Sequence, residues 1–327
     1  MLTIPKNTLK HLIQFSKTKG ISMKLARFFA IITAILPLAL AACTNAQKEA
    51  DLECFKGEMY SHWQEYDKAI GAYKNAIAAK PDYALAYYSI GQAYMGKNMM
   101  DSVIPSLEKA VEIDPKYLDA LLALGFAYSR KGDYDKGIET YQKAIDVKPD
   151  SALGYNNLGV AYHAGGKYDK AIESYNKALK LNPNFVEAWY NIGNSYAKKE
   201  SWNDAIQAFT KATQLKSDYS AAYFDMAYCY NKMGAGVDAA NNLGLYYFFN
   251  NSYNQAIEQF TAAVKAKPDY AVGYNNLGFV YDKLGKTAEA LDNFKIAARL
   301  GYEPAQRVLL NNKISWTDSG NTEKSKK

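Results

Sequence analysis

The sequence offers few side chains that could carry out covalent or acid–base chemistry. It contains three histidines and three cysteines, and His163 is the histidine that we expect near a binding surface. No serine or cysteine nucleophile with an aspartate partner can be placed beside His163 from the sequence, and no Cys or His spacing is typical of metal ligands. Gly234-Ala235-Gly236 is a fragment of a phosphate-binding loop, but it follows a helical pattern instead of a strand. We therefore predict no catalytic residues, no metal, no cofactor and no enzymatic activity.

Asparagine and aromatic side chains recur along the chain and could bind a peptide. Adjacent asparagines occur at residues 156–157, 241–242 and 275–276. An amide both donates and accepts hydrogen bonds, so it can pair with a peptide main chain whatever the side chains are. Aromatic rings beside such amides suit an extended or helical peptide. This pattern predicts protein or peptide partners and no small-molecule substrate.

A repeated helical hairpin must position these side chains. In the unit Ala152–Phe185, one helix face is formed by Tyr155, Leu158, Gly159 and Tyr162, which are spaced i, i+3, i+4 and i+7. Two glycines end this helix, a second amphipathic helix follows, and a proline stops it. A glycine costs about 1 kcal/mol relative to alanine in a helix interior. Its recurrence at the position of Gly159 therefore predicts a neighbouring helix too close for a larger side chain.

The pattern of one unit resembles the tetratricopeptide repeat, which has a bulky residue, Leu, Gly and Tyr in its first helix (helix A) and Ala, Phe or Tyr, and Ala in its second (helix B), before a Pro. The resemblance extends over roughly residues 50–302. The small residue of helix A recurs every 34 residues, and again after a change of phase, at Gly57, Gly91, Gly125, Gly159, Gly193, Ala227, Gly244 and Gly278. The resemblance implies an all-α, right-handed solenoid of antiparallel helix pairs, with about seven to eight repeats. We expect a capping helix at 303–312 and a disordered tail at 313–327.

The repeat changes phase near residues 234–237. Gly244 follows Ala227 by 17 residues, which is half a repeat. Residues 237–250 therefore either occupy the position of a missing helix B or begin a second segment, so that the solenoid breaks into 50–233 and 237–312. Four consecutive aromatic residues, Tyr246, Tyr247, Phe248 and Phe249, follow this change. They either fill space left by irregular packing or form an exposed anchor for a partner.

The resemblance also implies where a peptide would bind. Tetratricopeptide solenoids bind partners in a concave groove lined by the A helices, and the corresponding residues here are Tyr88, Gln92, Phe126, Asn156, Asn157, Val160, Tyr190, Asn191, Asn194, Phe224, Tyr228, Asn241, Asn242, Asn275, Asn276 and Phe279. The asparagines are similar to a ladder that grips extended peptides in some family members, although asparagine is also simply common at this position. The fifth and ninth positions carry no basic residue, so the clamp that other members use for acidic chain termini is not expected.

The N-terminal segment predicts export. Lys24 and Arg27 precede an apolar stretch at 28–40, and Ala41-Ala42-Cys43 follows, which is typical of a signal peptide within residues 1–42. Residues 40–43 resemble a bacterial lipobox, which implies that Cys43 is lipidated. We expect translation to start at Met23 and a short linker at 43–49. An ordinary signal peptide and an uncleaved membrane anchor are the alternatives.

Charge and chain organisation favour an adaptor. Residues 1–42 hold six of the 39 basic residues and none of the 33 acidic ones, so the rest of the chain is balanced and nucleic acid is not an expected partner. We therefore predict a non-catalytic adaptor that is lipid-anchored in the bacterial envelope, at the outer rather than the inner membrane. Its solenoid would lie in the periplasm or at the cell surface and bind peptides during assembly of an envelope complex. The alternative is a regulator of a cell-wall enzyme or a surface-exposed, host-binding lipoprotein.

Overall fold

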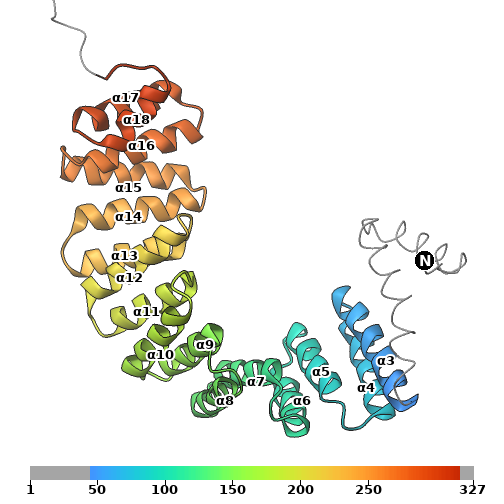
Figure 1. Cartoon of the computed structure of the whole chain (residues 1–327). Helices are drawn as coiled ribbons and strands as arrows, with labels where there is room; N and C mark the ends of the chain where they lie inside the picture. The colour runs from blue at the N-terminus through green and yellow to red at the C-terminus, as the bar shows by residue number, and fades with distance from the viewer. Residues whose placement is uncertain (1–44, 317–327) are drawn as a thin grey trace, which may run out of the picture. The chain divides into compact units, whose positions relative to one another are not determined.

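A computed structural model describes residues 45–316, and every regular element within this range is an α-helix (Figure 1). The predicted signal peptide, Cys43 and residues 317–327 lie outside this range. The chain forms two compact units, one ending at Lys131 and the other beginning at Gly132. Within each unit, successive helices form antiparallel pairs, so the predicted all-α solenoid class is confirmed.

The first unit contains α3 (Asn45–His62), α4 (Tyr66–Ala79), α5 (Ala84–Gly96), α6 (Met100–Ile113) and α7 (Leu118–Lys131). The second unit contains α8 (Tyr134–Val147), α9 (Ala152–Ala164), α10 (Tyr168–Leu181), α11 (Val186–Lys198), α12 (Trp202–Leu215), α13 (Ser220–Lys232), α14 (Gly236–Phe249), α15 (Tyr253–Ala266), α16 (Ala271–Lys283), α17 (Thr287–Arg299) and α18 (Glu303–Asn311).

Two kinds of turn connect the helices. Inside a pair, the turn contains a residue with positive φ, such as Gly166 at +74° between α9 and α10. Glycine adopts this left-handed conformation without steric cost. Between pairs, the chain leaves helix B in an extended conformation and a proline follows, as at Asn182 and Pro183 after α10, except after α12, where Ser217 takes its place. The kind of turn therefore identifies which helices form a pair.

The small residues of helix A mark a close approach of two helices. A Cβ built on Gly159 would lie 2.5 Å from Cε1 of Tyr175 in α10, well inside van der Waals contact. Ala171 and Ala178 on the same helix are fully buried. The predicted close packing is thus confirmed, and the same conflict between an added Cβ and a helix B side chain occurs at Gly57, Gly91, Gly193, Gly244 and Gly278.

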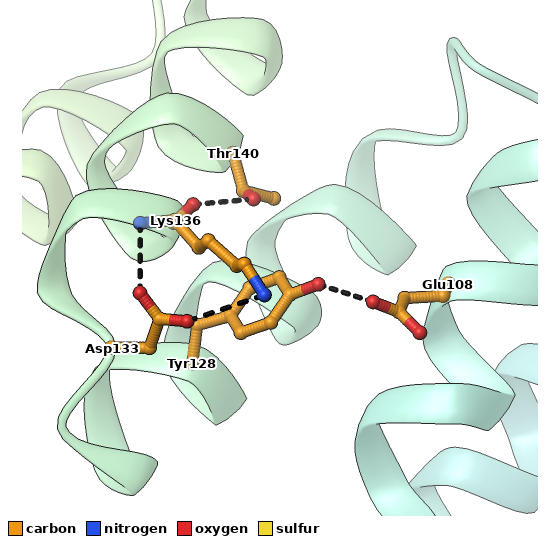
Figure 2. A network of polar contacts seen from close by, with 5 residues as sticks. All are labelled: Glu108, Tyr128, Asp133, Lys136 and Thr140. Carbon is orange, nitrogen blue, oxygen red and sulfur yellow. Dashed lines mark hydrogen bonds and ion pairs between the residues drawn. The ribbon is translucent and has the colours of Figure 1, made fainter.

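Polar contacts define helix ends and helix contacts inside each unit. In the first unit, Tyr128 of α7 donates a hydrogen bond to Glu108 of α6 (Figure 2). In the second unit, Asp133 caps α8 by accepting from the backbone N–H of Lys136 at 3.4 Å. Thr140 donates to the backbone carbonyl of Lys136 at 2.7 Å. Asp133 therefore satisfies a backbone donor that the first turn of a helix leaves unpaired.

The change of repeat phase does not break the second unit. Helix α14 packs against both α13 and α15, and it also contacts α16 (Figure 1). Both connecting turns contain a residue with positive φ, Gly234 at +75° and Asn251 at +59°. A separation into 50–233 and 237–312 is therefore contradicted. Helix α14 occupies the helix B place beside α13, but towards α15 it packs as a helix A through Gly244.

Both ends of the described range differ from the predicted linker and tail. Residues 45–49 form the first turns of α3 instead of a linker, because Lys80 donates to Gln47 at 2.6 Å and Tyr83 donates to Asp51 at 2.5 Å. Residues 313–316 are ordered against the last helices, where Trp316 accepts a hydrogen bond from Arg299. Helix α18 lies where we predict a capping helix. Among the helices of the described range, none is both long and apolar enough to cross a bilayer.

Candidate functional site

Large apolar side chains are exposed along the A helices of the second unit. Five of them, which we call the helix A row, have exposed fractions between 40% and 50%: Leu153, Val160, Phe224, Tyr228 and Phe279. Three of the five occupy the ninth position of their helix, so they recur on one face. In the first unit, Phe126 holds the same position and is also exposed. In the second unit, this recurrence on α9, α13 and α16 places apolar surface at the same position of several A helices, which is typical of an interaction surface.

Four of the eight predicted asparagines are buried and do not lie on that surface. Asn156, Asn241, Asn242 and Asn275 are only 4–6% exposed, so their prediction as groove residues needs correction. The reason is that the fifth position of a helix A faces the next helix A. There Asn191 donates to Oδ1 of Asn156 at 3.1 Å, and Asn276 donates to Oδ1 of Asn241 at 2.9 Å. We call such a hydrogen-bonded pair of side chains between neighbouring A helices a rung. Asn242 does not take part in one, because it donates to the carbonyl of Asp238 at 2.8 Å in its own helix.

A third rung has different chemistry. Between α11 and α13, Tyr190 donates to Oδ2 of Asp225 at 2.7 Å, and the Asn194 side chain interacts with the Tyr190 hydroxyl. Burial raises the pKa of the Asp225 carboxyl above its ordinary value, while the hydrogen bond from Tyr190 opposes this rise. Sequence reasoning missed Asp225. The signal was its place at the sixth position, where Asn191 and Asn276 stand in other A helices.

The four consecutive aromatic residues are packed against neighbouring rings. None of Tyr246–Phe249 is among the exposed large side chains. Tyr246 lies 5.2 Å from Phe224 between ring centroids, and Phe249 stacks on Tyr223 at 5.4 Å with an interplanar angle of 13°. The middle two rings pack on the core between α15 and α16. This burial favours the space-filling interpretation over an exposed anchor.

The remaining predicted positions are half-buried. In the first unit, the ring centroids of Tyr88 and Tyr117 are 5.1 Å apart, and the Gln92 side chain interacts with the hydroxyl of Tyr88. In the second unit, Asn157 accepts a hydrogen bond from Asn156 at 3.4 Å. These side chains are held by neighbours within their own unit, so they contribute less open surface than the exposed aromatic rings.

His163 is paired with a serine that cannot act as a nucleophile on a substrate. Its Nδ1 lies 2.8 Å from Oγ of Ser195, which also donates to the carbonyl of Asn191 at 3.1 Å. Ser195 is fully buried, so no substrate can reach its hydroxyl. Burial and the nearby ammonium of Lys198 lower the pKa of His163. Within residues 45–316, no group of His, Cys, Asp and Glu side chains has the arrangement of a metal site.

The two cysteines of the described range are packing residues. Cys54 and Cys229 are free and buried. Burial raises the pKa of Cys54 to about 12 and that of Cys229 to about 11, so both stay protonated near neutral pH. Both thiols therefore fill space between packed helices.

A cavity that the sequence did not predict opens on the helix B side of the second unit. It has a volume of about 410 Å³ and lies among α10, α11 and α12. Trp189, Ile192 and Tyr196 line it, with Asp204 and Lys211 among its polar residues. Trp189 is held by a hydrogen bond from Nε1 to the carbonyl of Pro183 at 2.9 Å. None of the residues of the helix A row lines this cavity.

Comparison with known families agrees with the helix pairing. A family model described as "TPR repeat" matches residues 57–98, 127–165, 161–200 and 244–285, and models described as "Tetratricopeptide repeat" match 84–117, 106–139 and 186–219. The chain belongs to the tetratricopeptide repeat family. Members of this family bind protein or peptide partners. The matched ranges leave out residues 220–243, which hold α13 and the first half of α14.

Several solved tetratricopeptide repeat structures resemble parts of the chain. A structure titled "Crystal structure of MamA protein" is 29% identical, covers 53% of this chain and 95% of its own, and has a TM-score of 0.48. MamA from Desulfovibrio magneticus RS-1 is 19% identical over 52% of this chain and 97% of its own, with a TM-score of 0.49. YrrB, titled "a TPR protein with an unusual peptide-binding site", is 19% identical over 62% of this chain and 95% of its own, with a TM-score of 0.43. No curated protein matches the sequence.

Proposed function

We propose that this protein is a non-catalytic adaptor whose helix A row holds a peptide segment of a partner protein. The observation that carries the proposal is the exposure of five large apolar side chains on A helices of the second unit, three of them at the same helix position. Exposed apolar surface is costly in water and is typical of sites that a partner covers. Helix α9 contributes Leu153 and Val160 and contains no Asp, Glu, Lys or Arg, which suits an apolar contact.

The burial of Ser195 and the protonated state of both buried cysteines support the non-catalytic part of the proposal. A nucleophile must reach its substrate, and a thiolate is the reactive form of cysteine. We therefore assign the His163–Ser195 contact to the packing of α9 on α11.

We also propose that the adaptor is attached to a bacterial envelope membrane through Cys43 and serves the assembly of an envelope complex. Support comes from the sequence: an apolar stretch at 28–40 is followed by Ala41-Ala42-Cys43. Two acyl chains suffice for stable attachment to a bilayer. Replacement of Cys43 by serine should leave an unlipidated precursor that a gel-shift assay and membrane fractionation detect. Normal processing and membrane retention of this variant would contradict the anchor.

The binding surface can be tested by photo-crosslinking in cells. A photoreactive amino acid at Tyr228 should capture a partner, whereas the same group at Leu215 should not. Leu215 is a matched control because it is an exposed apolar residue, at 40%, but lies at the end of a helix B. Mass spectrometry would identify the captured protein. Equal capture at Leu215, or capture of no protein at Tyr228, would contradict the proposed surface.

A further inference from the structure

Asp225 is the charged member of an otherwise neutral set of rungs. The rung of Asn156 and Asn191 and that of Asn241 and Asn276 pair amide with amide, whereas Asp225 places a carboxylate at the same register. Its hydrogen-bond partner is the Tyr190 hydroxyl, and no lysine or arginine within residues 45–316 forms an ion pair with it. An ionised carboxylate can accept about four hydrogen bonds. Asp225 thus retains unused acceptor capacity in a half-buried place, where an uncompensated charge is costly.

Exposed rings of the helix A row flank this carboxylate on α13. Phe224 precedes Asp225, and Tyr228 follows it by three residues, so Asp225 and Tyr228 share a helix face. Tyr246 packs on Phe224, and Trp202 packs on Tyr228 with ring centroids 6.0 Å apart. The result is an aromatic surface around one unneutralised carboxylate, held in place from α12 and α14.

The faces of these rings are suited to a cation. The ammonium of Lys232 already lies 5.4 Å from the centroid of the Tyr228 ring. Aromatic faces attract cations through the ring quadrupole, and a nearby carboxylate adds a charge-assisted hydrogen bond. A lysine or arginine side chain would also lay its apolar stem along the exposed rings while its head group stays polar.

We propose that the partner segment presents a lysine or arginine side chain whose head group pairs with Asp225 while its stem lies between Phe224 and Tyr228. This inference rests on the proposed function, because it names the chemistry of the segment that the helix A row holds. Charge complementarity selects this occupant: a basic side chain neutralises Asp225, an apolar one leaves the carboxylate unpaired, and an acidic one adds repulsion.

Replacement of Asp225 by asparagine isolates the charge. Asparagine keeps the shape of the side chain and the oxygen that accepts from Tyr190, and it restores the amide found at Asn191 and Asn276. The variant should therefore fold with an unchanged or higher melting temperature. Glu258→Gln is the matched control, because it removes one exposed negative charge from helix B α15.

The test uses pooled synthetic nonapeptides whose central residue is fixed as lysine, arginine, norleucine or glutamate, with other positions randomised among uncharged residues. Affinities for the full chain are measured by fluorescence anisotropy. We expect the lysine and arginine pools to bind roughly tenfold more tightly than the norleucine pool. Asp225→Asn should abolish this difference, and Glu258→Gln should keep it.

Each outcome has a definite meaning. A preference for basic pools that survives in Asp225→Asn, or equal binding of basic and norleucine pools to the native chain, overturns the assignment of Asp225. In both cases, the double variant Phe224→Ala and Tyr228→Ala tests the proposed function separately. If this variant no longer binds the peptide pools, the helix A row is still the peptide-binding surface. Binding of no pool to the native chain overturns the proposed peptide site itself and the inference with it.

Discussion

Two regions of the second unit share one contact between a helix A and the helix that follows it, but differ in the helix that comes before. They are the regular junction of α9, α10 and α11 and the irregular stretch of α13, α14 and α15. In the first, Gly159 receives the Tyr175 ring of the following helix; in the second, Gly244 receives the Phe260 ring of α15. An added Cβ would lie 2.5 Å from the facing Cε1 atom in both places. The packing of a helix A on the helix that follows it is therefore unaffected by the change of phase.

The two regions differ in how helix A meets the helix before it. At the regular junction, a proline-containing turn leads into α11, and the Asn156–Asn191 rung joins α9 to α11. At the irregular stretch, a glycine turn leads from α13 directly into α14, and rings of Tyr246 and Phe249 cover α13. Half a repeat can thus be absent without a break, because α14 takes the helix B place beside α13 and its aromatic rings fill the contact between the two helices.

The largest effect should come from filling the shared close contact. Gly159→Val and Gly244→Val should each lower the free energy of unfolding by about 2–3 kcal/mol, because the added carbons overlap the facing ring. Equal costs at the two sites would show that α14 packs on α15 as α9 packs on α10. Urea denaturation followed by circular dichroism measures both.

Gly71→Val is the control for this comparison. Gly71 lies inside α4, and apart from the adjacent residues and backbone of its own helix nothing lies within 4 Å of a Cβ built there. Valine and glycine differ by only a few tenths of a kcal/mol in helix propensity, so the control should change stability little. A harmless Gly244→Val beside a damaging Gly159→Val would show that α14 does not act as a helix A.

An intermediate effect should separate the two regions. Phe249→Ala removes the ring stacked on Tyr223 and should cost about 2 kcal/mol, the sum of a lost aromatic pair and lost apolar burial. Leu181→Ala, at an exposed side chain that ends α10, should change stability by less than about 0.5 kcal/mol. If Phe249→Ala is as mild as this control, the aromatic run does not hold α13 to α14, and an exposed anchor regains support.

The fold could be predicted from the sequence because one physical constraint repeats. A glycine that must admit a ring, such as Gly159 facing Tyr175, recurs every 34 residues and reveals the helix pairs. The change of phase was also visible as a half-period spacing. The packing of α14 on α13 could not be predicted in the same way. The motif around Gly244 indicates the contact with α15, but it carries no information on the helix that precedes α14.

The site was predicted less well because helical periodicity predicts which side chains share a helix face, but not which other helix packs against that face. Asn156 and Val160 lie four residues apart on α9, yet the first is buried against α11 and the second is exposed. The contact with Asn191 of the next helix A distinguishes them, and this contact cannot be read from α9 alone. Asp225 was passed over for the same reason, since its half-buried state depends on Tyr190 from another helix.

The smallest effect concerns the ionisable group at the regular junction. The pKa of His163 is lowered in the folded state by burial and by Lys198, so below a pH of about 6.5 the unfolded chain binds a proton that the folded chain resists. The stability that neutral His163 contributes is therefore complete above that pH and is lost as the pH falls through it. His163→Gln, which can still hydrogen-bond Ser195, should lose less stability between pH 7.5 and pH 5.5 than the native chain.

Urea denaturation at both pH values measures this difference. Phe249→Ala is the control and should show the native pH dependence, because it alters only the aromatic contact between α13 and α14. An unchanged pH dependence in His163→Gln would mean that protonated His163 is tolerated between α9 and α11.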